Sequence, residues 1–157
     1  MTTKEEELIC VHTVEAALIG ICRKGNQIGV SRGESRILTS AIFYAFSRLA
    51  KEFPQRFPHV YFTEGPQGTV PISKGIEDIL FDMGACGLTR LGGDFRTEVI
   101  PKETKLVWKE SLENSVSLET LEELIILSGR FKELVQEFKG EKQARRKICF
   151  HQNNVRD

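Results

Sequence analysis

Apolar residues recur at steps of three and four along much of the chain, which is the spacing of amphipathic helices. This spacing predicts four helices, over about residues 5–24, 34–53, 73–86 and 117–139. The apolar stripe of the second is wide enough for a central core helix. Residues 102–113 are compatible with a further helix but do not require one.

Residues that commonly begin or end helices stand at several of these boundaries. Ser73 and Ser117 can cap helix N-termini with their hydroxyl groups. Pro54 cannot continue a helix, because its ring removes a backbone donor. Gly25 and Gly140 suit the left-handed backbone that often follows a last turn. These residues support the predicted helix boundaries.

A β-hairpin is the clearest local signal in the sequence. Residues 88–91 and 95–100 are strand-like and flank a glycine-rich turn at 92–94. A shorter β-prone run, 60–63, leads into a loop rich in glycine and proline at 64–71. The order of elements predicts a mainly α (α+β) fold. We expect a winged-helix-like helical domain with one small β-hairpin and a long C-terminal helix.

The middle of the chain, residues 37–101, resembles the SocA-type (Panacea) antitoxin domains. The resemblance rests on the order of a few segments. A core helix at 37–49 is followed by a short strand at 61–62 and a loop with Gly65-Pro66. A second helix at 76–83 then leads, through a hairpin that starts at Gly87-Leu88, to another helix start at 99–105. This resemblance implies a protein-binding adaptor or a neutralising partner. It does not imply an enzyme.

The length of 157 residues fits one domain, which we place at residues 1–139. The chain has 22 basic and 22 acidic residues, but they are spread unevenly. Residues 139–157 hold six basic and two acidic residues, so the remainder is mildly acidic. We therefore predict that 140–157 form a basic, flexible tail.

The N-terminus and the cysteines indicate a cytoplasmic protein. The first residues are acidic, whereas a secretory signal begins with basic ones. The four cysteines are scattered without paired spacing, which is typical of reduced thiols. We expect no membrane span, because no apolar run is long enough.

The sequence gives little support for catalysis. It holds no GxxxxGK phosphate loop, and we do not expect an enzyme or a cofactor. Cys10, His12, Cys149 and His151 could supply four metal ligands. Their CxH spacing is not that of structural zinc sites, and we predict no metal.

The predicted partner-binding site lies on the last helix. Its apolar stripe contains Leu121, Leu124, Phe131, Val135 and Phe138. If part of this stripe stays exposed, it can dock another protein or a second copy of the chain. The alternative for the stripe is that it packs on the domain's own core. We predict a non-enzymatic protein–protein interaction module, antitoxin-like or adaptor.

A winged-helix transcriptional regulator that binds DNA as a dimer is the alternative function. Its nucleic-acid contacts would come from the hairpin and the tail, through Arg90, Arg96, Arg145, Arg146 and Lys147. The helix that would enter the major groove, 73–86, carries three acidic residues and one lysine. Phosphate groups would repel it, so this alternative is not favoured.

Overall fold

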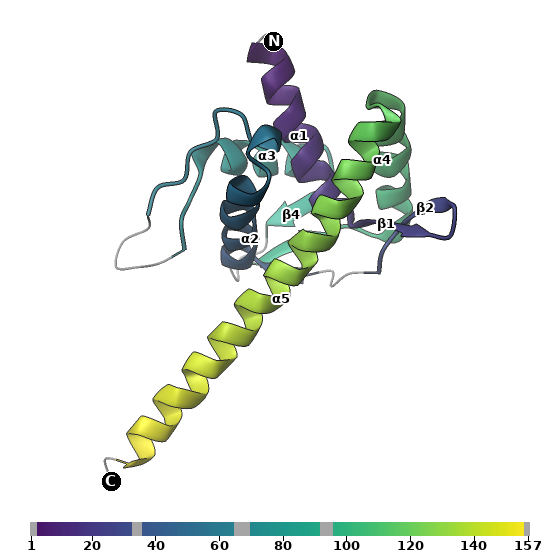
Figure 1. Cartoon of the computed structure of the whole chain (residues 1–157). Helices are drawn as coiled ribbons and strands as arrows, with labels where there is room; N and C mark the ends of the chain where they lie inside the picture. The colour runs from purple at the N-terminus through teal and green to yellow at the C-terminus, as the bar shows by residue number, and fades with distance from the viewer. Residues whose placement is uncertain (1–2, 33–35, 65–69, 92–95, 156–157) are drawn as a thin grey trace.

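The computed structural model describes residues 3–32, 36–64, 70–91 and 96–155, with the side chains of these ranges except 91 and 141–155. The fold is mainly helical with a minor β component, as predicted (Figure 1). In chain order the elements are α1 (Thr3–Ile19), β1 (Ile21–Lys24), β2 (Gln27–Val30), β3 (Arg36–Leu38), α2 (Thr39–Glu52), the 3-10 turn η1 (Pro54–Arg56), α3 (Lys74–Ala85), β4 (Thr89–Leu91), β5 (Arg96–Val99), α4 (Lys102–Ser115) and α5 (Leu118–Val155).

The core forms where α5 packs against α1 and α2. Leu124, Leu127 and Leu134 of α5 are fully buried there. The ring of Phe131 lies 5.0 Å from that of Phe46 on α2, a distance at which tilted aromatic rings attract. The half of α1 nearest its C-terminus is buried almost all round, so it has no strongly polar face. The apolar stripe of α5 thus holds the domain together.

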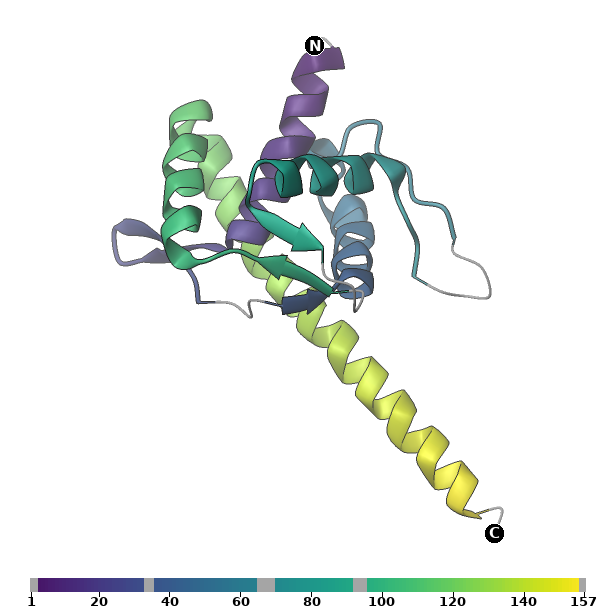
Figure 2. The same cartoon turned by 180° about the vertical axis from the view of Figure 1, so that it is seen from behind.

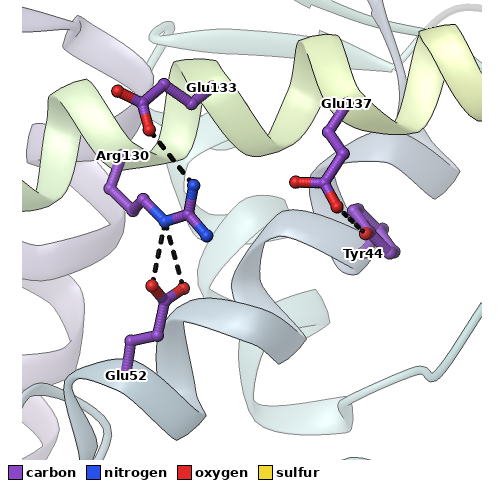
Figure 3. Close-up of polar contacts among 5 residues, drawn as sticks. All are labelled: Tyr44, Glu52, Arg130, Glu133 and Glu137. Atoms are coloured by element: carbon purple, nitrogen blue, oxygen red, sulfur yellow. Dashed lines mark hydrogen bonds and ion pairs between the residues drawn. The ribbon is translucent and has the colours of Figure 1, made fainter.

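Polar contacts join the exposed edges of α2 and α5 (Figure 3). The Nε of Arg130 donates to the Glu52 carboxylate at 2.9 and 3.3 Å, and its Nη1 donates to Glu133 at 3.1 Å. About two turns beyond Arg130 on α5, Glu137 accepts a hydrogen bond of 3.1 Å from the Tyr44 hydroxyl. These contacts set the position of α5 on α2 beyond what apolar packing specifies.

The first helix is shorter than predicted, because a β-hairpin replaces its last turn. Gly20 has φ +68°, in the left-handed region, and this turns the chain from α1 into β1. Strand β1 then pairs antiparallel with β2, with Lys24 opposite Gln27. Gly25, with φ +61°, is the first of the two turn residues, as a type II′ turn requires. The prediction of a helix to residue 24 is therefore wrong.

A second, three-stranded antiparallel sheet has the order β3-β5-β4. Its β4–β5 hairpin was predicted, although the turn at 92–94 lies outside the described residues. Strand β3 was not: helix α2 begins at Thr39, and residues 36–38 pair with β5 instead. The Thr39 and Thr97 hydroxyls, 3.0 Å apart, tie α2 to β5. The predicted strand at 60–63 is also wrong, since only Thr63 forms a bridge, with Ile72.

The predicted serine caps are confirmed. The Ser73 hydroxyl accepts from the Ile76 amide at 3.3 Å, and that of Ser117 accepts from the Thr120 amide at 3.1 Å. The ambiguous segment after Pro101 is helical, as α4. The predicted end at residue 139 is wrong, because α5 continues through Gly140 to Val155. Both views show this last part of α5 extending away from the other elements (Figures 1 and 2).

Candidate functional site

The predicted partner-binding stripe on α5 is not a surface in this fold. Leu121, Leu124, Phe131 and Val135 are at most 5% exposed, and Phe138 is half-buried beside Tyr44. These side chains fill the contact with α1 and α2, so they cannot meet a partner while the domain is folded. The structure thus places four of the five predicted partner-binding residues in the core of the domain.

The arginines predicted for nucleic acid are divided between two regions. Arg90 and Arg96 are exposed on β4 and β5. In the sheet register Glu98 lies opposite both Arg90 and Arg36, so a carboxylate stands between two of the basic strand residues. The other three, Arg145, Arg146 and Lys147, belong to the last part of α5, for which the structure describes only the backbone. The described residues do not unite the five into one basic surface.

The outer face of α3 combines acidic residues with an exposed aromatic ring. Glu77, Asp78 and Asp82 all point to solvent, while Lys74 is the single basic residue of the helix. The Lys74 ammonium lies 3.5 Å from Asp78, leaving the other two carboxylates in excess. Phe81 is 72% exposed, which is unusual for so large an apolar side chain. It is three positions after Asp78, so the two are neighbours on the helix surface.

A groove lies between α3 and the first turns of α1. The two helices contact each other, and α3 also packs next to β4 (Figure 2). Its volume is about 390 Å³. Four carboxylates line it, two from each helix: Glu6, Glu7, Asp78 and Asp82. His59 closes one side and pairs with Glu6, and its backbone is held at φ +57°. The groove is therefore acidic, with one imidazole at its rim.

The floor of this acidic groove is closed by a buried thiol and an arginine behind it. Cys10 is 3% exposed, and burial raises its pKa to about 11. The guanidinium of Arg56, on η1, donates to the Thr13 hydroxyl at 3.1 Å and to the Ile9 carbonyl at 3.4 Å. These partners satisfy Arg56 inside the fold. A neutral thiol is a poor nucleophile, so we assign Cys10 a packing role in the floor of the groove.

Comparison with known proteins gave no match: no family model fits the chain, and neither a curated protein nor a solved structure matches it. Within the described ranges, no group of three or more His, Cys, Asp or Glu side chains is arranged to hold a metal. None of the described helices combines the length and apolar character that crossing a bilayer requires.

Sequence reasoning missed the acidic groove, although it noted the acidic face of α3. Glu6 and Asp78 are separated by more than 70 positions, and nothing in the spacing of either helix indicates that they meet. The exposure of Phe81 had a sequence signal. Ile76, Ile79, Leu80 and Met83 already complete the buried stripe of α3, so Phe81 falls on the other face.

Proposed function

We propose that this chain is a non-enzymatic protein-interaction module, and that the outer face of α3 with the acidic groove docks a basic segment of another protein. The observation that carries the proposal is the exposed Phe81 ring beside a groove lined by four carboxylates. An aromatic anchor surrounded by charge is typical of a protein interface, where the ring supplies buried area and the charges select the partner.

The charge of the face defines the chemistry of the partner. Lysine or arginine side chains would pair with Asp82 and Glu7, which form no salt bridge with another described residue and are exposed to solvent. An apolar side chain of the same partner would cover Phe81. The two arms joined by the Thr63–Ile72 bridge before α3 carry Tyr61 and Ile72, which are 75% and 43% exposed. A basic segment with one or two apolar residues therefore fits best, as part of an adaptor or antitoxin-like complex.

The DNA-binding regulator remains the second candidate, because the chain has the order of elements that a winged helix has. Helices α2 and α3 are followed directly by the β4–β5 hairpin, and β3 completes the sheet. In such a unit α3 would enter the major groove. Glu77 and Asp82, the two α3 carboxylates without a salt bridge to a described residue, would then lie near the DNA phosphates. Binding there requires cationic side chains, because they replace the counterions of the phosphates. Electrostatics thus favours a protein over a nucleic acid at α3.

Site-specific photo-crosslinking in the natural host tests the proposal. A photoreactive phenylalanine analogue replaces Phe81 in one variant and Val107 in a control, since Val107 of α4 is similarly exposed at 68%. We expect position 81 to form an adduct with a defined protein and position 107 not to form it. The crosslinked peptide of the partner should be basic.

Charge reversal provides the second arm of this experiment. The double variant Asp78→Lys, Asp82→Lys should abolish the adduct at position 81 without changing the folding of the domain, because both side chains are exposed. Nucleic acid crosslinked at position 81 would support the regulator instead. An adduct only at position 107 would place the partner surface on α4 and contradict the proposal.

A further inference from the structure

A second hollow in the molecule has the opposite charge. It lies where the end of α1 meets α4, α5 and the residues after β2, and consists of two adjoining cavities of about 220 and 190 Å³. Both are lined by Ser31, Arg32, Val99 and Lys105, so they form one cleft, which we call the cationic cleft. It is separate from the acidic groove and shares no lining residue with it.

Two lysines converge in the cationic cleft from different helices. Lys105 of α4 is only 8% exposed, although lysine is almost never fully buried unless it is paired. Lys132 of α5 is half-buried, and its ammonium donates to the Ser31 hydroxyl. Arg32 and, at the mouth, Lys102 add two further cations. No Asp or Glu is among the described residues that line either cavity.

The energetics of this arrangement call for an anion. Burial lowers the pKa of Lys105, and the neighbouring Lys132 charge lowers it further. The pKa of Lys132 is also lowered by burial. A buried charge without a counter-charge is destabilising, and two like charges are more so. A lysine whose stem merely covered apolar surface would extend its ammonium into bulk water, whereas Lys105 is more than nine-tenths buried.

Gly20 keeps the cleft open beside the lysines. A Cβ at this position would lie 2.6 Å from the Ser31 Oγ and 3.2 Å from the Lys132 Cε. The remaining walls are apolar and include Leu18, Ile37 and Phe131. The cleft thus offers cations at one part and an apolar wall at another, with more volume than a single inorganic anion needs.

We propose that the cationic cleft binds a small phosphate monoester, with the phosphate held by Lys105, Lys132 and Arg32 and the organic group against the apolar wall. Phosphate carries two negative charges near neutral pH and accepts several hydrogen bonds, which matches three converging donors. This proposal is independent of the α3 surface, since the two hollows share no residue.

Thermal unfolding of the whole chain tests the proposal, with inorganic phosphate and phenyl phosphate as probes at pH 7 and sodium chloride at equal ionic strength as the reference. We expect the melting temperature to rise with phosphate concentration, and to rise further with phenyl phosphate, because a ligand of the native state stabilises it by mass action. Benzoate and phenol separate the contribution of the phosphate from that of the ring.

Matched variants locate the effect. Lys105→Met should weaken phenyl phosphate binding in calorimetric titration by about tenfold or more, as loss of a charge-assisted contact predicts. Lys109→Met is the control, because Lys109 lies one turn further along α4, pairs with Glu113 and lines neither cavity. Lys132→Gln, which retains a donor for Ser31, provides a second test if the methionine variant folds poorly.

Three results would overturn the proposal. The melting temperature could be the same in phosphate and chloride. The Lys105 and Lys109 variants could lose binding equally, which would indicate a general charge effect. A short DNA duplex could bind in a Lys105-dependent manner while phenyl phosphate does not, which would assign the cleft to a nucleic-acid backbone.

Discussion

The acidic groove and the cationic cleft differ more in burial than in number of charges. The groove has four carboxylates, but Asp78 and Asp82 are exposed and water screens them. The cleft has Lys105 buried and Lys132 half-buried, and both line the same cavity. The chain has a formal net charge of zero, yet it contains two sites of opposite charge. Buried charges without a counter-charge destabilise the folded state, whereas exposed charges do not. A small ligand of opposite charge would therefore stabilise the protein by binding the cleft.

The largest effect on stability should come from filling the wall of the cationic cleft. Gly20→Ala combines a positive φ with a 2.6 Å clash at Ser31, so we expect a loss of about 2–4 kcal/mol in unfolding free energy. Gly25→Ala is the matched control, with φ +61° but nothing within 4 Å, and should cost about 1 kcal/mol. Urea denaturation measures both. Equal losses would mean that the cleft wall tolerates a methyl group.

Glu15, which is partly buried on α1, should make stability depend on pH in a lower range than Lys105 does. Burial raises the pKa of Glu15 on α1 to about 7, above its ordinary value of 4.5. Between these values the folded state holds the proton and the unfolded state has lost it, so stability falls as pH rises from 4.5 to 7. Glu15→Gln should remove this fall and be about 2 kcal/mol more stable at pH 8. Urea denaturation across this pH range would refute the idea if the variant kept the wild-type slope.

Lys105 should give the opposite slope in alkaline solution. Its folded pKa lies below the ordinary value of 10.5, so the unfolded state binds more protons there and stability rises as pH approaches 10.5. Lys105→Met should flatten this rise and gain about 1 kcal/mol at pH 7 without phosphate. Equilibrium unfolding at pH 7 and pH 9.5 checks it. A variant less stable than the wild type in chloride would show that Lys105 already has a counter-charge.

The smallest effect on stability is expected in the acidic groove. Asp78→Asn and Asp82→Asn should each change the unfolding free energy by less than about 0.5 kcal/mol, because exposed charges and surface ion pairs contribute little. Chemical denaturation at low and moderate salt is the appropriate measurement. A loss above 1 kcal/mol would show that these carboxylates hold α3 in place, and it would weaken their assignment to a partner.

Local sequence rules predicted the elements whose causes are local. The caps at Ser73 and Ser117, the β4–β5 hairpin and the apolar stripes all follow from residues close together in the chain. Strand β3 could not be predicted in this way, because residues 36–38 continue the helical spacing of α2. Their partner is β5, some 60 residues later, and this distant pairing outweighs local propensity.

The candidate sites were harder to predict for the same reason. Leu124 and Phe131 were correctly placed on one helix face, but the spacing could not say whether that face meets the core or a partner. Lys105 and Lys132 come from α4 and α5, and each has an unremarkable sequence context. Only the tertiary fold brings them together. Sequence patterns identified the faces, whereas the contacts between the faces decide their function.

Binding of a basic protein segment by α3 and the acidic groove can be tested with one affinity measurement. The protein captured through position 81 would be titrated against the wild type, the Phe81→Ala variant and the double variant Asp78→Lys, Asp82→Lys. Each titration would be done at about 50 and about 300 mM salt, roughly one third and twice the physiological ionic strength. We expect the dissociation constant to rise about tenfold or more for both variants, and the salt dependence to vanish with charge reversal. Unchanged affinity in the charge-reversed variant would contradict the account.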